Sequence, residues 1–198
     1  MFRHRLPLLA AALLAPHIAR SAGALEGFYG IERPPSADFS SAVSGVSAPD
    51  LFKTSLQMYG GDVLFNLGGL ELGAILDTTF GDHTASQTAI GALGGLSFGT
   101  GLTLDLLAEA GGHRYGDFVS NPQIITASST NEWLFYVGLR PGVRFKVAGP
   151  MFAGLWGFAR WDVSSQKVPV TVGSAASAGS YKLGGTTIGA TLRLGLEL

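Results

Sequence analysis

Acidic and arginine residues are the side chains of this sequence best suited to chemistry, and they are separated along the chain. Seven acids lie in the first five extended segments: Glu26, Glu32, Asp62, Glu71, Asp77, Asp105 and Glu109. Most of the arginines lie in the last three: Arg140, Arg144, Arg160 and Arg193. A forked guanidinium suits bidentate pairing with a carboxylate, and a charge in a low-dielectric interior is costly unless it is paired. If these segments enclose an interior, we expect ion pairs across it.

Six of these residues form the predicted charge network. We expect three arginines to pair with three acids, namely Arg140, Arg144 and Arg193 with Glu71, Asp105 and Glu109. Such pairs would plug a narrow interior. The alternative is a charged interior that conducts ions or small solutes.

Catalytic side chains are scarce. His83 and His113 are the histidines outside the N-terminal 24 residues. His113 and Ser120 are seven positions apart with Gly116 between them, whereas adjacent side chains on one face of a strand are two positions apart. We therefore expect His113 at the rim of the fold. The sequence predicts no catalytic, cofactor-binding or metal site and no enzymatic activity, and it has no cysteine for a disulfide.

The first 24 residues have the pattern of a cleavable export signal. A basic head at residues 3–5 precedes the ten apolar residues of segment 6–15. Ala22 and Ala24 then stand at positions −3 and −1 of a cut after Ala24. A membrane helix needs about 20 apolar residues, and this segment is interrupted by Pro16. We predict a signal peptide over 1–24 and one folded domain over 25–198.

The composition of the predicted mature chain is apolar and poor in charge. Charged residues make up 14% of the sequence, against roughly 25% in soluble domains, and hydrophobic residues make up 46%. The 29 glycines favour strands and tight turns over long helices. Without Arg3, Arg5 and Arg20, ten basic residues stand against 14 acidic ones, so nucleic acid is not an expected partner.

Apolar and polar residues alternate with period two, which predicts strands. In the last segment Leu192, Leu194 and Leu196 fall on one face, opposite Arg193. Eight strands are predicted: Leu25–Glu32, Leu51–Phe65, Leu70–Phe80, Gln87–Phe98, Leu102–Tyr115, Trp133–Phe145, Met151–Val163 and Thr187–Leu198. The second changes parity at 60–61, which predicts a β-bulge there. The seventh has bulky residues on both faces, so the sequence does not orient it.

Short and long connections alternate between these strands. Those at 66–69, 99–101 and 146–150 are short, whereas those at 34–50, 116–131 and 164–180 are long and polar. We expect mobile loops at 34–50 and 164–180, with 168–172 extending the seventh or eighth strand. Tight turns on one side and long loops on the other are typical of outer-membrane barrels.

The composition of the polar face indicates that it lies inside. The outside of a soluble barrel is dense in charged residues. Here the polar face is mostly Gly, Thr and Ser, while the apolar face carries aromatic residues near strand ends: Phe80, Phe98, Trp133 and Phe145. Such residues suit the interfaces of a membrane. The sequence therefore predicts an all-β protein, an eight-stranded antiparallel up-and-down transmembrane β-barrel.

This pattern resembles the small outer-membrane barrels, the OmpA transmembrane domain, OmpX and OmpW among them. The resemblance spans residues 25–198 and concerns architecture. In that group the last strand guides the assembly machinery, and Thr187–Leu198 has its alternation, although Leu198 departs from the usual terminal aromatic residue. The resemblance implies an outer-membrane location, contact with membrane lipids or lipopolysaccharide, and a monomer.

Three functions remain open at the level of sequence. The first is a structural or surface-interaction role in adhesion or envelope integrity, with a plugged interior. The second is a narrow OmpW-like channel for small or hydrophobic solutes. The third is a soluble lipid-binding barrel. The sequence predicts no cofactor.

Overall fold

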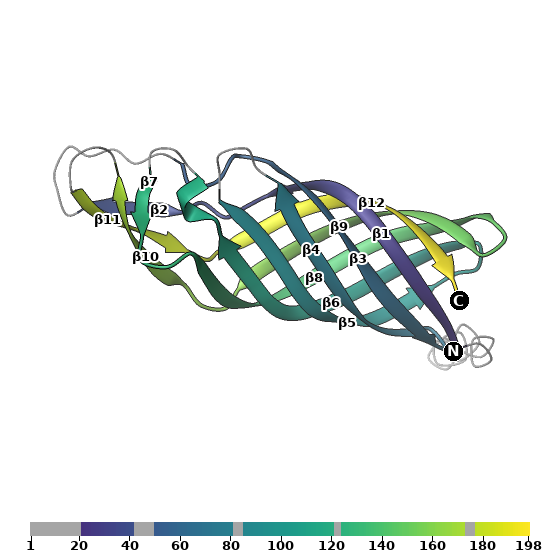
Figure 1. Ribbon diagram of the computed structural model, residues 1–198. Coiled ribbons are helices and arrows are strands. Elements are labelled where there is room, and N and C mark those ends of the chain that lie inside the picture. The colour runs from purple at the N-terminus through teal and green to yellow at the C-terminus, as the bar shows by residue number, and fades with distance from the viewer. Residues whose placement is uncertain (1–20, 42–49, 81–84, 121–123, 173–176) are drawn as a thin grey trace, which may run out of the picture.

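The computed structural model describes residues 21–41, 50–80, 85–120, 124–172 and 177–198. Eight long strands form the body of the fold: β1 (Ser21–Arg33), β3 (Leu56–Leu67), β4 (Leu70–Phe80), β5 (Ser86–Phe98), β6 (Leu102–Gly116), β8 (Asn131–Ala148), β9 (Met151–Asp162) and β12 (Thr186–Glu197). They close into an antiparallel barrel in the order β1-β12-β9-β8-β6-β5-β4-β3 (Figure 1). The predicted fold class is confirmed.

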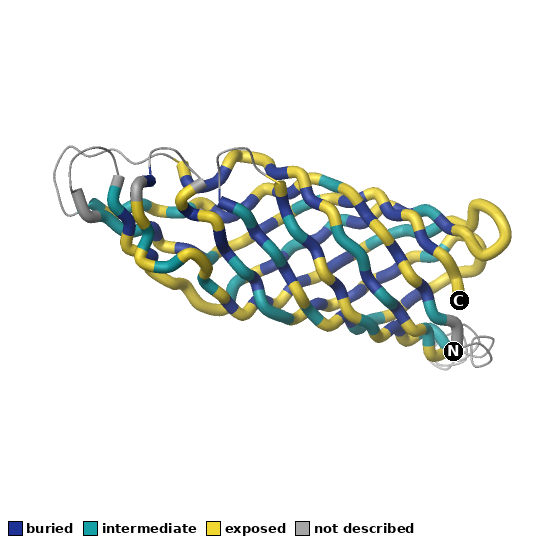
Figure 2. Tube along the Cα trace, viewed as in Figure 1, coloured by how far each residue is buried: buried dark blue, intermediate teal, exposed yellow. Residues whose placement is uncertain are grey.

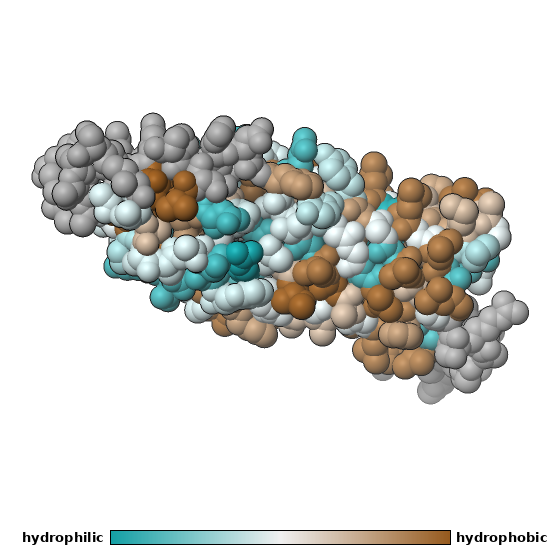
Figure 3. All heavy atoms as spheres, viewed as in Figure 1, coloured by the Kyte–Doolittle hydropathy of each residue, from teal (hydrophilic) through white to brown (hydrophobic). Residues whose placement is uncertain are grey.

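Apolar side chains cover the outside of this barrel, and its lumen holds the charged side chains together with a cluster of buried apolar ones. In β12, Leu192 is 68% exposed whereas Arg193 is 1% exposed. Figure 2 shows buried and exposed residues alternating along the barrel strands, and Figure 3 shows apolar residues gathered mainly over the half of the barrel nearest the chain termini. A soluble barrel built around an apolar ligand would need the opposite arrangement. Among the residues that the structure describes, no helix is long and apolar enough to span a membrane.

The structure also orients β9, which the sequence left open. Its alternate residues Phe152, Trp156, Phe158 and Arg160 are buried in the lumen. Leu155 on the opposite face is exposed. Large aromatic rings therefore occupy the inside of this wall, where small and polar residues were expected.

Strand β3 contradicts the predicted bulge at 60–61. Its register is continuous with both β1 and β4. Met58 and Leu64 both point inward, and Tyr59 and Phe65 both point outward. The prediction was wrong because Leu64 is an apolar residue in the lumen, so both faces of β3 are apolar near its end.

Tight glycine turns close one end of the barrel. Gly68 and Gly69 join β3 to β4 with φ of 71° and 94°, and Gly149 joins β8 to β9 with φ of 54°. Side chains with a Cβ rarely adopt these values. Figure 1 places these turns at the end where β1 begins and β12 ends.

The long connections at the other end build a second sheet, which their polar composition did not predict. Its strands are β2 (Asp38–Ser41), β7 (Ile124–Ala127), β10 (Gln166–Val172) and β11 (Ser177–Leu183), in the order β2-β11-β10-β7. A 3₁₀ turn, η2 (Phe118–Ser120), precedes β7. The segment 168–172, which was expected to extend the seventh or eighth strand, instead lies in β10, a separate strand of this sheet.

This sheet and the strand ends below it form what we call the cap. A cluster of buried residues lies at its centre: Leu51, Phe52, Leu56, Ala85, Tyr115, Phe118, Ile124, Leu134, Val168, Val170, Tyr181 and Leu183. They come from connections far apart in the chain, which polar composition alone did not reveal. Burial raises the pKa of the Tyr181 hydroxyl to about 12, with the nearby charge of Asp50 adding to the effect.

Candidate functional site

The lumen holds the candidate site, because nearly all the charged residues predicted to point inward are buried there. The buried charged residues of the lumen are Glu26, Glu32, Asp62, Glu71, Asp77, Asp105, Glu109, Arg140, Arg160 and Arg193. Arg144 lies with them, and its side chain is 11% exposed. Successive side chains of a strand point to opposite faces of the sheet. Because the apolar residues next to these charged ones in sequence face outward, the charged side chains face the lumen.

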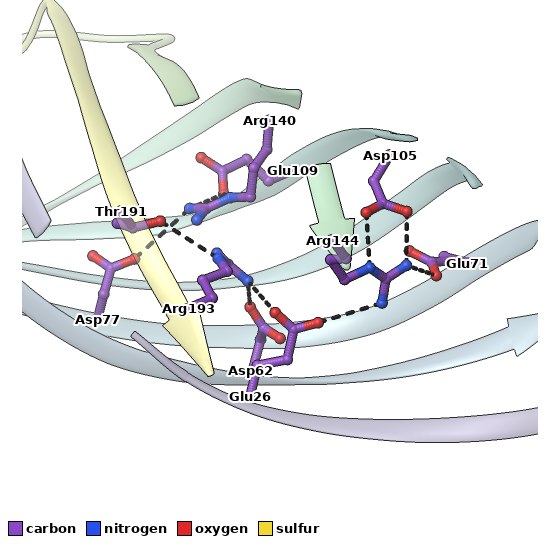
Figure 4. Close-up of polar contacts among 10 residues, drawn as sticks. All are labelled: Glu26, Asp62, Glu71, Asp77, Asp105, Glu109, Arg140, Arg144, Thr191 and Arg193. Carbon is purple, nitrogen blue, oxygen red and sulfur yellow. Dashed lines mark hydrogen bonds and ion pairs between the residues drawn. The ribbon is translucent and has the colours of Figure 1, made fainter. Parts of the chain in front are cut away.

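Arg144 of β8 is the centre of a first group of ion pairs. Its Nε donates to Asp105 Oδ2 at 2.8 Å and its Nη2 to Asp105 Oδ1 at 2.7 Å, a bidentate pair (Figure 4). Nη2 also donates to Glu71, and Nη1 donates to Glu26 Oε1 at 3.4 Å. One guanidinium therefore joins strands β8, β6, β4 and β1 across the lumen.

Arg193 of β12 has different partners from those predicted. Its Nη1 donates to Glu26 Oε2 at 3.1 Å and to Asp62, and it does not pair with Glu71, Asp105 or Glu109. The reason is the closure of the barrel, which places β12 beside β1 and β1 beside β3. Because Glu26 accepts from both Arg144 and Arg193, the contacts of these two arginines form one network, which is the first group.

Arg140 and Arg160 form a second group. Arg140 Nη2 donates to Glu109 Oε2 at 2.9 Å, and Arg160 Nε donates to Glu109 Oε1 at 2.6 Å. Arg160 also holds Asp77 through two nitrogens, one of them Nη1 at 2.9 Å from Oδ1. The predicted network contained Arg140 and Glu109 but not Arg160, because the sequence did not orient β9.

Aromatic rings separate the four arginines. Arg193 Cζ lies 4.5 Å from the ring centroid of Phe28 and 4.6 Å from that of Trp156, and Arg160 Cζ lies 4.8 Å from that of Phe158. The remaining contacts, at 5.1–5.9 Å, complete one alternating series: Tyr136, Arg160, Phe158, Arg140, Phe28, Arg193, Trp156, Arg144 and Phe152. At these distances a guanidinium group is attracted to the face of an aromatic ring. We call this series the arginine–aromatic stack.

Each phenylalanine and tryptophan ring of the stack has a glycine directly opposite it on a neighbouring strand. The pairs are Phe28 with Gly60, Phe152 with Gly195, Trp156 with Gly142 and Phe158 with Gly189. A Cβ on Gly142 would lie 2.3 Å from the Trp156 indole. The glycines therefore leave the space into which the rings fold, an arrangement known from sheets in which an aromatic residue covers a glycine.

A polar layer containing His113 lies between the stack and the cap. His113 Nδ1 is 3.1 Å from Asp162 Oδ1, and its Nε2 is 3.1 Å from Gln87 Oε1. Tyr115, a residue of the cap cluster, donates its hydroxyl to Asp162 Oδ2 at 2.5 Å. The prediction that His113 lies at the rim is wrong, since the residue is buried. The side chain of Ser120, the other residue considered, lies outside the described set.

Glu32 is the exception among the buried charges of the lumen. It is 2% exposed, and the described residues give its side chain no ion pair or hydrogen bond. Every other lumen carboxylate named above contacts an arginine or, for Asp162, the His113 layer. Within the described residues, no three or more histidine, aspartate or glutamate side chains are arranged to hold a metal ion.

Comparison with solved structures identifies the architecture. The outer membrane protein OprG from Pseudomonas aeruginosa superposes with a TM-score of 0.63 at 10% sequence identity, over 90% of this chain and 96% of that one. Neisserial surface protein A gives 0.53 at 9% identity, over 89% and 97%. This is the fold of the small eight-stranded outer-membrane β-barrels. No protein-family model and no curated protein matches the chain.

Within this outer-membrane barrel fold, the structure brings all six residues of the predicted network into the lumen. Arg140 meets Glu109, and Arg144 meets both Glu71 and Asp105. The arginine–aromatic stack was missed, although a signal for it exists. Four aromatic or arginine residues of β9 recur at even spacings, Phe152, Trp156, Phe158 and Arg160, and strand periodicity places them on one face.

Proposed function

We propose that this chain is an exported outer-membrane barrel with a closed lumen, and that it serves a structural or surface-interaction role, in adhesion or envelope integrity, through its cap. The arginine–aromatic stack is the observation that carries this proposal. Solute passage through eight strands needs a continuous water path, and the interior of so small a barrel is only just wide enough for side chains. A series of nine interleaved rings and guanidinium groups occupies that width.

The energetics of the stack support a permanent plug. Each arginine is held by at least one carboxylate and by two rings, so moving one would leave a buried carboxylate without its partner. The cap closes the lumen again with a layer of apolar side chains. Two barriers of different chemistry therefore oppose conduction, which is why the narrow-channel alternative is weaker.

The outer surface supports insertion with the cap on the outside of the cell. Among the described outward-facing positions of the eight barrel strands, Arg33 and Arg114 carry the charge, and both lie near the capped end. Arginine suits the phosphate groups of lipids. Membrane lipids or lipopolysaccharide are therefore the proposed partners of this rim.

The last strand supports assembly as a barrel protein. Leu194, Leu196 and Leu198 face outward and are exposed, while Arg193 faces the lumen. We expect the barrel-assembly machinery to recognise this strand, and we expect a monomer in the outer membrane.

Two measurements on the purified protein test the proposal. The first is heat-modifiability on SDS gels after membrane fractionation, with boiled protein as the control. We expect a compact band from the unboiled outer-membrane fraction. The second is single-channel recording in planar bilayers, in which we expect no steady conductance. A soluble, unshifted protein would overturn the membrane assignment, and large steady conductance would establish the channel instead.

A further inference from the structure

Strand β1 begins before the predicted mature chain. It starts at Ser21, whereas a cut after Ala24 would make Leu25 the first residue. The residues 21–24 pair in register with Leu64–Leu67 at the end of β3. Their backbone is therefore part of the barrel wall.

The same residues close the seam between the first and last strands. Leu198 N donates to the carbonyl oxygen of Gly23 at 2.7 Å, and Ala24 stands opposite Glu197. Ala24 is also buried within the apolar cluster of the lumen, beside Phe28 and Leu64. A cut after Ala24 would remove the acceptor for Leu198 and the edge of this cluster.

Such a cut would also expose strand backbone where hydrocarbon surrounds the barrel. Phe65 and Leu67 point outward and are exposed, so the end of β3 lies in the apolar part of the wall. Unpaired backbone groups are costly in hydrocarbon because water does not reach them there. A new ammonium group at Leu25 would lie at the same place, since Leu25 pairs with Val63 and Leu196.

The sequence contains a second cleavage pattern that avoids this loss. Ala19 and Ser21 are small residues at positions −3 and −1 of a cut after Ser21. A cut after Ala22 would place Arg20 at −3, which is not small. A cut after Gly23 has small residues at both positions but removes the carbonyl that accepts from Leu198.

We propose that the export signal is removed after Ser21, so that the mature protein begins Ala22-Gly23-Ala24 and keeps the seam of β1, β3 and β12 intact. This inference rests on the proposed export of the chain. It assigns the processing site from the requirements of the folded barrel together with the small-residue rule.

The test is the N-terminal sequence and intact mass of protein extracted from the outer membrane of an expressing Gram-negative host. We expect Ala22 as the first residue. Leu25 or Ala24 in protein recovered from the outer membrane would overturn the inference while leaving the proposed function intact. An unprocessed chain in the soluble fraction would overturn the proposed export itself.

Two substitutions, one at position −3 of each candidate cleavage site, test the assignment of the site without N-terminal sequencing. Ala19→Leu enlarges position −3 of the Ser21 site and lies in the removed segment under either alternative, so it does not alter the mature protein. We expect it to slow processing, whereas Ala22→Leu, at −3 of the Ala24 site, should leave processing unchanged. The reverse pattern would overturn the inference. Ala15→Leu, upstream of both sites, serves as the matched control.

Discussion

At the scale of single residues, Glu32 shows that not every acidic side chain in the lumen is paired with a basic one. It is buried without an ion pair or hydrogen bond in the part of the chain that the structure describes, unlike Glu26, which accepts from two arginines. Replacing a buried carboxyl group that has no partner by an apolar side chain of similar length relieves its desolvation cost. We expect Glu32→Met to stabilise the barrel by about 1–3 kcal/mol, measured as a rise in the urea midpoint of protein refolded in lipid vesicles.

The matched control for this prediction is Glu26→Met. It removes the contacts to Arg144 and Arg193 and should lower the midpoint, because two guanidinium groups in the lumen lose charge compensation. Equal effects of the two substitutions would mean that Glu32 has a partner of its own.

The pair of Arg160 and Asp77 tests the second group of charges. Arg160→Met leaves Asp77 buried without its bidentate partner, since Arg140 reaches it only at 4.0 Å. Breaking one side of a buried pair costs about 3–5 kcal/mol. We expect Asp77→Asn to restore most of that loss in the Arg160→Met background. A double-mutant cycle on vesicle-refolded protein measures this coupling, and additive effects would show that the two residues stabilise the fold independently.

At the scale of strands, the stack depends on the register that sets each ring against a glycine. Gly142→Ala would place a Cβ 2.3 Å from the indole of Trp156. Overpacking of this kind costs about 1–3 kcal/mol. We expect a lower urea midpoint and a shift in the tryptophan emission maximum, as Trp156 moves from between Arg193 and Arg144.

Gly157→Ala is the control for this prediction. Gly157 faces outward on β9, and the nearest atom to a Cβ there is 3.9 Å away. The substitution should change neither the midpoint nor the emission. If Gly142→Ala behaved in the same way, the tight packing between β8 and β9 would be refuted.

The strands differ in how well their sequences predict which face points into the lumen. β12 was predictable because its outward residues from position 188 onward are Ile, Ala and Leu and its inward ones are Thr, Gly, Arg and Glu, so one parity fits throughout. β9 was not orientable because the protein places aromatic rings in the lumen, where their apolar surface is matched by arginines and glycines of other strands. β3 was misread for a related reason, since Leu64 is apolar and faces inward. Periodicity identifies strands reliably, but it identifies faces only where the two faces differ in chemistry.

The partners of the charged residues and the core of the cap could not be predicted from the sequence, because both depend on contacts between distant parts of the chain. The inward position of Arg193 followed from alternation, but its partners Glu26 and Asp62 follow from ring closure, which no local pattern encodes. The cap likewise assembles residues such as Phe39, Ile124, Val168 and Tyr181 from three separate connections. Each connection alone contains too few apolar residues to predict a core.

At the scale of the whole molecule, the proposed closure of the lumen rests on the stack and the cap acting in series. The stack lies inside the barrel itself, and the cap cluster lies beyond the His113 layer, at the end opposite the chain termini. Barriers in series imply that either one is sufficient to prevent conduction. This arrangement predicts a specific pattern among variants that open one barrier or both.

Replacing the hairpin of β10 and β11, residues 166–183, by a short Gly-Ser linker removes much of the cap. We expect this variant to remain non-conducting in planar bilayers, because the stack is untouched. Arg144→Ala combined with Trp156→Ala thins the stack, and with the cap present we again expect no conductance. The combination of both changes should conduct, since water then has a path past both barriers. Heat-modifiability of every variant verifies that the barrel has formed, and conductance from either single variant would refute closure in series.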